Sequence, residues 1–198
     1  MENNMKIRIT FMEEVLGSSP AKQEIYRDYI ASKAPDAATI EDEVAAVGVD
    51  EVTEQGMTVF PRTKDGVPFA YDYQIKGMFK DTCGMLARVK TTESSKLKAY
   101  KKIIDGLIFV YPREIPYQFD GEIGKCDRPL RAQTAQGERV AIASSETVPA
   151  GASLEFEVEC LDSAHKKAVF EWLEYGQKRG FSQWRNSGKG RFTFEVIE

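Results

Sequence analysis

Histidine is almost absent from this sequence, since His165 is the single histidine in 198 residues. A cluster of histidine ligands for a metal ion is therefore excluded, and a serine-histidine-aspartate site could be built only on His165. The three cysteines, Cys83, Cys126 and Cys160, are odd in number and widely spaced, which fits neither a disulfide framework nor paired metal ligands. We expect reduced thiols, with Cys83 and Cys160 buried, and neither a metal nor another cofactor.

Long apolar runs are also missing. No segment approaches the roughly 20 apolar residues that span a bilayer, and the first residues, MENNMKIRITF, pass directly from polar residues into a strand pattern. We therefore expect no membrane association and no export, with the cytoplasm as the location. With 42% hydrophobic and 29% charged residues, the chain is expected to form a single domain over residues 1–198 that can carry a sizeable insertion.

Charge is unevenly distributed, although the formal net charge is only -4. Residues 13–54 are strongly acidic, whereas residues 76–102 and the C-terminal stretch are basic. Prolines and Gly48 separate two short helical patterns in the acidic part, so we interpret residues 13–56 as an acidic helical insertion after the first strand. The basic patches are the candidates for contact with a polyanion, because the local field attracts such a ligand more than the net charge does.

Hydrophobic periodicity predicts a mixed succession of strands and helices. Ile7, Ile9 and Phe11 alternate with polar residues as in a half-buried strand, and a hairpin with a turn at Gly66 is expected next. The clearest helix spans residues 74–89, with an apolar face that includes Ile75, Met78 and Phe79 opposite a stripe of Lys76, Lys80 and Arg88. The later segments predict a short helix over 96–104, a strand over 106–112, two strands joined at Gln136 and Gly137, a strand over 154–160, a helix over 162–177 that Gly176 stops, and a strand over 192–196.

This order predicts an α+β fold of the ferredoxin-like, RRM-like sandwich type. Three segments in it carry local signatures, and they occur in the order YQIKGMFKDTCGMLARV (73–89), SSETVPAGASLEFEV (144–158) and FSQWRNSGKGRFTFE (181–195). Together they resemble the first helix, the turn before a core strand and the glycine-rich loop of the RAMP superfamily, the RNA-binding backbone proteins of CRISPR effector complexes. The whole chain is also similar to proteins carried by phages and prophages of Firmicutes.

The resemblance implies a non-catalytic protein of a phage or mobile element that binds single-stranded RNA through backbone contacts, using one face of its sheet, in a bacterial host cell. Target-cutting relatives carry an aspartate in the loop after the first strand, and the acidic insertion here offers no aspartate that aligns with it. Backbone subunits polymerise along their guide, so a homo-oligomer along RNA is compatible with the resemblance, although no residue pattern supports it.

The loop before the last strand carries the predicted chemistry. Its cations supply charge, its neutral polar residues supply hydrogen bonds, and its glycines expose backbone N–H groups to a phosphodiester. Trp184 and Phe181 are expected to stack on bases. With the basic stripe of the first helix, the predicted nucleic-acid-binding residues are Lys76, Lys80, Arg88, Trp184, Arg185, Asn186, Ser187, Lys189 and Arg191. The alternative is structural: Trp184 covers the core, the loop is a solvated turn, and the stripe is the wet face of an amphipathic helix.

Two other functions remain open at this point. An anti-CRISPR or other anti-defence protein would bind a defence complex, by mimicry of a backbone subunit or by docking its acidic insertion on a basic surface. A metal-independent RNA-processing nuclease would need a general base, and His165 does not match the N-terminal position of the histidine in enzymatic members of the superfamily.

Overall fold

The computed structural model describes residues 4–21, 57–134 and 137–197. Within these ranges, residues 130–134 and 137–141 are described by their backbone alone. Its main sheet has four antiparallel strands in the order β11-β1-β10-β6. Ile7 lies opposite Phe156 and Ile9 opposite Leu154 across the central pair. The strands are β1 (Asn4–Phe11), β6 (Ile108–Tyr111), β10 (Ser153–Cys160) and β11 (Phe192–Val196).

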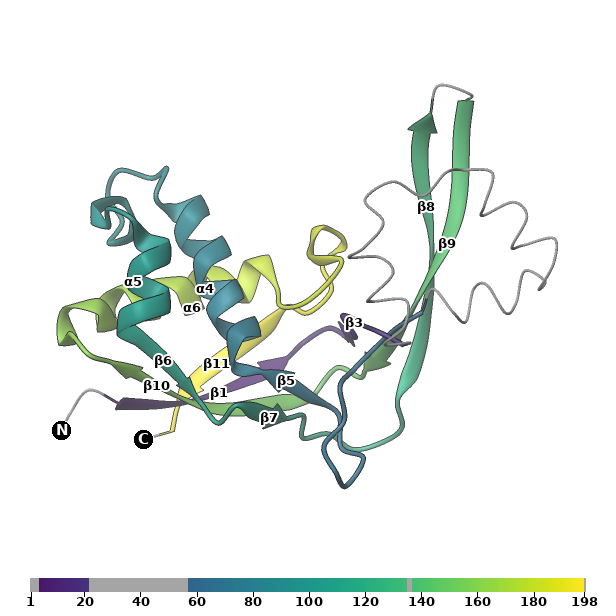
Figure 1. Cartoon of the computed structure of the whole chain (residues 1–198), viewed down its shortest axis with the longest axis horizontal. Helices are drawn as coiled ribbons and strands as arrows, with labels where there is room; N and C mark the ends of the chain where they lie inside the picture. The colour runs from purple at the N-terminus through teal and green to yellow at the C-terminus, as the bar shows by residue number, and fades with distance from the viewer. Residues whose placement is uncertain (1–3, 22–56, 135–136, 198) are drawn as a thin grey trace.

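Three helices cover one face of this sheet, and none of the described elements covers the other face, which we call the open face (Figure 1). They are α4 (Asp72–Leu86), α5 (Tyr100–Leu107) and α6 (Lys166–Arg179). Strand alternation sends Ile7, Ile9 and Phe156 toward the helices, where each is at most 2% exposed. The predicted apolar face of the first helix is confirmed for Ile75 and Phe79, which are fully buried. The fold is therefore of the α+β class.

The prediction that Gly176 stops the last helix is wrong. The helix continues to Arg179 and ends at Gly180, which has a φ of 84°. A Cβ atom at Gly176 would lie 3.0 Å from the ring of Phe192, so glycine here permits close packing of α6 on β11. Glycine inside a helix costs about 1 kcal/mol relative to alanine, and this contact gives the reason for it.

A second sheet holds the long hairpin that the sequence predicted. Strands β8 (Gly124–Thr134) and β9 (Gly137–Val148) form a two-stranded arm that extends away from the helices (Figure 1). Short strands pair around its base: β2 (Val15–Leu16), β3 (Ser19–Pro20) and β4 (Thr58–Val59). The predicted hairpin with a turn at Gly66 is present, because Arg62 and Pro68 form an antiparallel bridge and the Gly66 N–H donates to the Thr63 carbonyl. Beyond this hairpin, β5 (Phe69–Tyr71) pairs with β7 (Glu114–Pro116).

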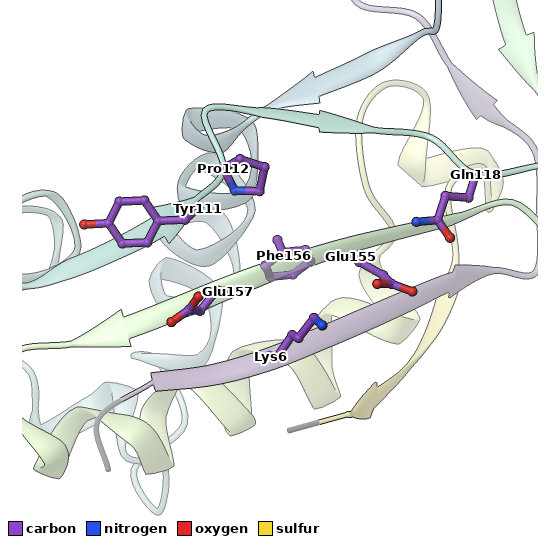
Figure 2. A pocket seen from close by; sticks show the side chains of 7 residues that line it. All are labelled: Lys6, Tyr111, Pro112, Gln118, Glu155, Phe156 and Glu157. Atoms are coloured by element: carbon purple, nitrogen blue, oxygen red, sulfur yellow. The ribbon is translucent and has the colours of Figure 1, made fainter. Parts of the chain in front are cut away.

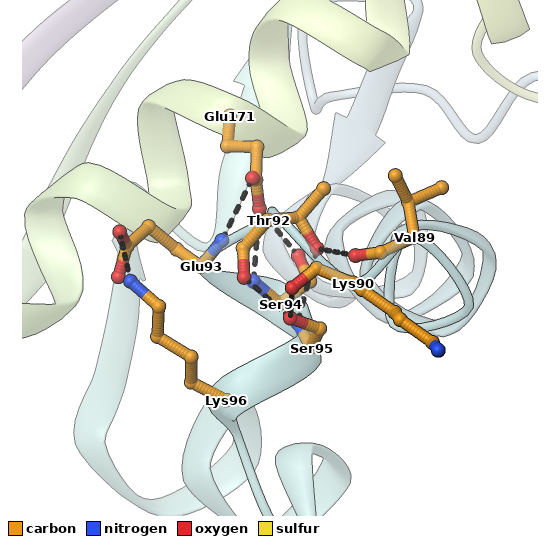
Figure 3. Close-up of polar contacts among 8 residues, drawn as sticks. All are labelled: Val89, Lys90, Thr92, Glu93, Ser94, Ser95, Lys96 and Glu171. Atoms are coloured by element: carbon orange, nitrogen blue, oxygen red, sulfur yellow. Dashed lines mark hydrogen bonds and ion pairs between the residues drawn. The ribbon is translucent and has the colours of Figure 1, made fainter.

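A polar network fixes the chain after α4 against α6. Thr92 donates its hydroxyl to the carbonyls of Leu86 and Val89, which follows the end of the helix. Glu171 on α6 then accepts from the N–H groups of Glu93 and Ser94 at 2.9 and 3.0 Å, and from the Ser94 hydroxyl (Figure 3). The network leads into the 3₁₀ turn η1 (Ser94–Lys96). One carboxylate thereby satisfies two backbone donors that would otherwise lack partners.

The expectation of buried, reduced thiols at Cys83 and Cys160 is confirmed. Both are free and fully buried, whereas Cys126 is half-buried. Burial raises the pKa of the Cys160 thiol to about 11, and it also raises the pKa of Cys83. Because the thiolate is the nucleophile, both groups are expected to be unreactive near neutral pH.

Residues 22–56 of the predicted acidic insertion lie outside the described residues, but the chain on either side of them is described. The Ala21 N–H donates to the Met57 carbonyl at 3.1 Å, and Ser19 pairs with Val59. Val15 and Leu16 are fully buried, so the predicted start of the insertion at residue 13 includes two core residues.

Replacing residues 22–56 by a short Gly-Ser linker is expected to leave a folded domain. The two ends already meet in a strand pair, and loop-closure free energy changes by only about 0.6 kcal/mol for each halving of length. Urea unfolding of the shortened protein should remain one cooperative transition. Loss of cooperativity would show that the replaced segment contributes to the core.

Candidate nucleic-acid interface

The segment Phe181–Arg191, which we call the closing loop, leaves α6 and returns to β11. The Phe181 N–H donates to the Gly190 carbonyl at 2.8 Å, and the Gly190 N–H donates to the Glu14 carbonyl at 3.0 Å. Phe181 is 2% exposed and packs against Phe11, with ring centroids 6.0 Å apart. The loop is thus fixed at its base to the core, and its tip forms the 3₁₀ turn η3 (Arg185–Ser187).

Gly190 has an internal structural role. Its φ is 68°, and a Cβ atom there would lie 2.0 Å from the Phe181 carbonyl oxygen. Gly188 also has a positive φ, 91°, but its nearest neighbour would be the Arg191 guanidinium at 3.8 Å. The close backbone approach that the sequence suggested is therefore made to the loop's own opening residue.

Two arginines converge on one carboxylate at the loop. Arg179 Nε, from the last turn of α6, lies 3.2 Å from Asp81 Oδ2, and Arg185 Nη1 lies 2.7 Å from the same oxygen. Arg179 also donates to Asn186 Oδ1 at 2.9 Å. All three charged side chains are between 25% and 30% exposed, so solvent reaches them. Asp81 lies on α4, which means that the loop is docked on that helix.

The loop also contacts the base of the β8–β9 arm through Arg128. The Arg128 guanidinium donates to Ser145 Oγ at 3.2 Å and to Gln183 Oε1 at 2.9 Å, and its Cζ lies 5.2 Å from the centre of the Trp184 ring. Arg128 is only 8% exposed, yet both of these hydrogen-bond partners are neutral side chains. Trp184 itself is 39% exposed and takes a φ of 53°, which is uncommon outside glycine. The Trp184 ring is thus already in contact with a cation. The prediction that Phe181 stacks on bases is wrong, because that ring is buried in the core.

A pocket of about 320 Å³ lies beside these side chains. The sequence patterns indicated neither Arg179, which stands in the last turn of a helix just before the loop, nor Arg128, which stands in a strand distant from the loop in sequence. The position of Arg179, directly before the helix-ending Gly180, was the sequence signal that could have indicated its place beside the loop. The lining residues are Arg179, Ser182, Gln183, Trp184, Arg185 and Asn186.

The other predicted loop residues, Ser187, Lys189 and Arg191, do not line this pocket. Lys189 donates to Glu14, and this hydrogen bond raises the pKa of the lysine. Ser187 donates its hydroxyl to the Trp184 carbonyl at 2.8 Å, which holds the turn closed. Arg191 is exposed and lines a separate pocket of about 470 Å³ with Met12.

The structure does not bring the predicted basic stripe to the loop. Lys80 forms an ion pair with Asp105 of α5 at 2.5 Å, and Lys76 donates to the Asp105 carbonyl at 3.3 Å and lies over the Phe109 ring. Arg88 is exposed and follows the end of α4. Since residues 76 and 80 face α5 while residue 81 faces the loop, the two halves of the predicted site lie on different sides of α4.

The open face of the main sheet is acidic. Glu155 and Glu195 both contact Arg8, at 2.6 and 2.8 Å, and these contacts raise the pKa of the guanidinium. Figure 2 shows Lys6, Glu155 and Glu157 around a pocket of about 450 Å³ on this face, with Tyr111 at the edge strand. The open face also carries Glu159 and no aromatic side chain on the central strands β1 and β10, both of which the structure describes in full. The prediction that RNA binds through a face of the sheet is therefore disfavoured by like charge.

His165 is remote from the loop. It lies at the end of the turn η2 (Ser163–His165), at the start of α6, whereas the loop follows the end of that helix. A helix of this length spans about 20 Å. Within the described part of the chain, no group of three metal-ligating side chains is close enough to hold an ion, and no helix has the length and apolarity to cross a bilayer.

Comparisons with known proteins give a likeness in fold. No protein-family profile matches the chain, and no curated protein matches it. Among solved structures, a chain in the cryo-EM structure of the type III-B Cmr-beta bound to cognate target RNA is similar, with a TM-score of 0.54 and 9% sequence identity over 99% of this chain. The present chain spans 60% of the length of that chain. At this identity the likeness concerns the fold alone.

Proposed function

We propose that this protein is a non-catalytic RNA-binding protein of the RAMP type, and that it contacts the backbone of single-stranded RNA through the closing loop. The proposal rests on the pocket that Arg179, Arg185 and Trp184 line together, with the Arg128 guanidinium over the Trp184 ring. Guanidinium groups match phosphate geometry, and an aromatic ring beside them offers a surface for a base. These contacts recognise a nucleic-acid backbone without reading its sequence.

The topology supports the RAMP-type assignment. In chain order the main elements are β1, α4, β6, β10, α6 and β11, and the sheet order is β11-β1-β10-β6. The fourth strand thus lies beside the first, and the third lies between the first and the second, as in a ferredoxin-like sandwich built from two βαβ halves. The similar Cmr-beta chain belongs to an assembly that was solved with its target RNA. The proposal also includes a location in the cytoplasm, where the protein would meet RNA.

A second candidate rests on the acidic open face. Glu155, Glu157 and Glu159 project from one strand, which suits a basic protein surface better than RNA. An anti-defence protein that binds a CRISPR complex would use this face, and it would bind that complex but not free RNA.

The test compares two charge-matched double variants in RNA binding. A fluorescein-labelled single-stranded RNA of mixed sequence is titrated with protein, and anisotropy is read across a salt series. Arg179→Ala with Arg185→Ala is expected to weaken binding about tenfold and to lower the salt slope by roughly 0.7 for each lost phosphate contact. Lys76→Ala with Lys80→Ala removes the same charge beside α5 and is expected to change affinity less than about twofold.

Both variants should keep the stability of the parent protein, because part-exposed ion pairs contribute about 1 kcal/mol or less. If the unmodified protein shows no salt-sensitive RNA binding at micromolar concentration, the RNA function fails. Equal weakening by both variants would instead mean that Lys76 and Lys80 also belong to the RNA site. The absence of catalysis stays a prediction, which incubation of a hairpin RNA without metal would check.

A further inference from the structure

Asp81 occupies the centre of the cationic cluster in the proposed RNA site. Its Oδ2 accepts from Arg179 Nε at 3.2 Å and from Arg185 Nη1 at 2.7 Å, so two guanidinium groups from different elements point at one oxygen. Arg179 is further oriented by Asn186, and Arg185 lies in the turn η3. A single anionic oxygen bound by two converging guanidiniums is also the arrangement in which arginines bind a phosphate oxygen.

The Asp81 contacts can be exchanged for another anion at small cost. The three side chains are between 25% and 30% exposed, so water already screens the pair and a ligand can reach it. An ion pair with this exposure favours the paired state over the separated state by an equilibrium factor of about two to five. The pocket lined by Arg179, Arg185 and Asn186 lies directly beside the pair, and it provides space for the incoming group.

We infer that Asp81 is an internal competitor for RNA: its carboxylate holds the position of a phosphate group between Arg179 and Arg185, and a bound phosphodiester replaces it there. This inference rests on the proposed RNA function and specifies how the site is regulated. In the free protein Asp81 pairs with both guanidiniums and offsets one of their two positive charges, and the loop stays docked on α4. When RNA binds, its phosphate takes over both arginines, and Asp81 turns to solvent.

The other carboxylates near basic residues do not have this arrangement. Asp105 pairs with Lys80 on the far side of α4, and its backbone carbonyl accepts from Lys76. Glu14 pairs with Lys189, a single ammonium group. Among the described residues, Asp81 is the carboxylate on which two guanidiniums of the candidate site meet.

The inference is tested with Asp81→Asn, which keeps the side-chain shape and removes the charge. Binding of the fluorescein-labelled single-stranded RNA is expected to tighten about three- to tenfold, and the salt slope is expected to steepen by up to roughly 0.7 for each phosphate that the released arginines newly bind. The matched control is Glu159→Gln on the open sheet face, which changes net charge equally and is expected to alter affinity less than about twofold. In an Arg185→Ala background, the tightening caused by Asp81→Asn should fall by half or more, because one of the two released cations is gone.

The outcomes separate this inference from the proposed function. If the unmodified protein binds RNA and Asp81→Asn binds equally or more weakly, the competitor role is wrong while the RNA function stands. If neither binds RNA, the RNA function itself fails. A tightening that is the same with and without Arg185 also overturns the inference, since a general charge effect would then suffice.

A second measurement does not depend on the Asn variant folding. In ¹H–¹⁵N spectra of the unmodified protein, the Nε–H signal of Arg179 is expected to shift during titration with the same RNA, because its acceptor changes from carboxylate to phosphate. An Arg179 signal that stays fixed while loop amides shift would contradict the exchange.

Discussion

Gly190→Ala is expected to lower the free energy of unfolding by at least about 3 kcal/mol. The new methyl group would meet the Phe181 carbonyl at 2.0 Å, and neither the strand that follows nor the buried Phe181 can move without loss of core packing. The positive φ adds a further cost of about 1 to 2 kcal/mol. Because the loop base would open, RNA affinity is expected to fall even at temperatures where the variant stays folded.

Gly188→Ala is the matched control, since it lies in the same loop with a similar positive φ and no neighbour closer than 3.8 Å. We expect it to cost about 1 kcal/mol, which urea unfolding of both variants will measure. Equal losses for the two substitutions would mean that the loop base is not closed between Phe181 and Gly190.

Trp172→Ala is expected to cost about 3 to 5 kcal/mol of stability. Trp172 is fully buried, its ring centroid lies 5.5 Å from that of Phe79 on α4, and its indole N–H donates to the Ser94 hydroxyl at 2.9 Å. The substitution therefore leaves a large cavity between α6 and α4, and it also removes one donor from the network around Glu171.

The second tryptophan supplies the control for this prediction. Trp184→Ala, at a 39% exposed position, is expected to cost no more than about 1 kcal/mol in stability. Its effect should appear in RNA binding, where one stacking surface is lost at about 1 to 3 kcal/mol per base. Thermal unfolding and RNA titration of both variants will separate the roles. A stability loss at Trp184 equal to that at Trp172 would support the alternative that Trp184 covers the core.

Local patterns in the sequence predicted the elements of the fold well, because alternation and helical periodicity report directly on burial. Ile7, Ile9 and Phe11 give β1, and Ile75 with Phe79 gives the buried face of α4. Gly176 was misread because its role depends on Phe192, a residue that meets it only in the folded chain. A glycine that ends a helix and one that permits close packing look alike in sequence.

The candidate site was predictable only in part for the same reason. The closing loop stood out through its cations and glycines, but the partners of those cations come from other elements. Asp105 neutralises Lys80 and Asp81 holds Arg185, and no local pattern indicates either pairing. Arg128 reaches Trp184 from the base of a distant hairpin. Tertiary contacts thus determine which cations lie close together. They place the candidate site at the end of α6 rather than on the basic stripe of α4.

Ultraviolet cross-linking will show directly whether RNA lies on the closing loop, as we propose. The unmodified protein is bound to single-stranded RNA that contains 4-thiouridine, irradiated and digested, and the cross-linked peptides are identified by mass spectrometry. We expect cross-links within Phe181–Arg191, with Trp184 as the leading site. Cross-links concentrated at Tyr111 and Phe109 of the edge strand, with none in the loop, would contradict it and place RNA on the open face of the sheet.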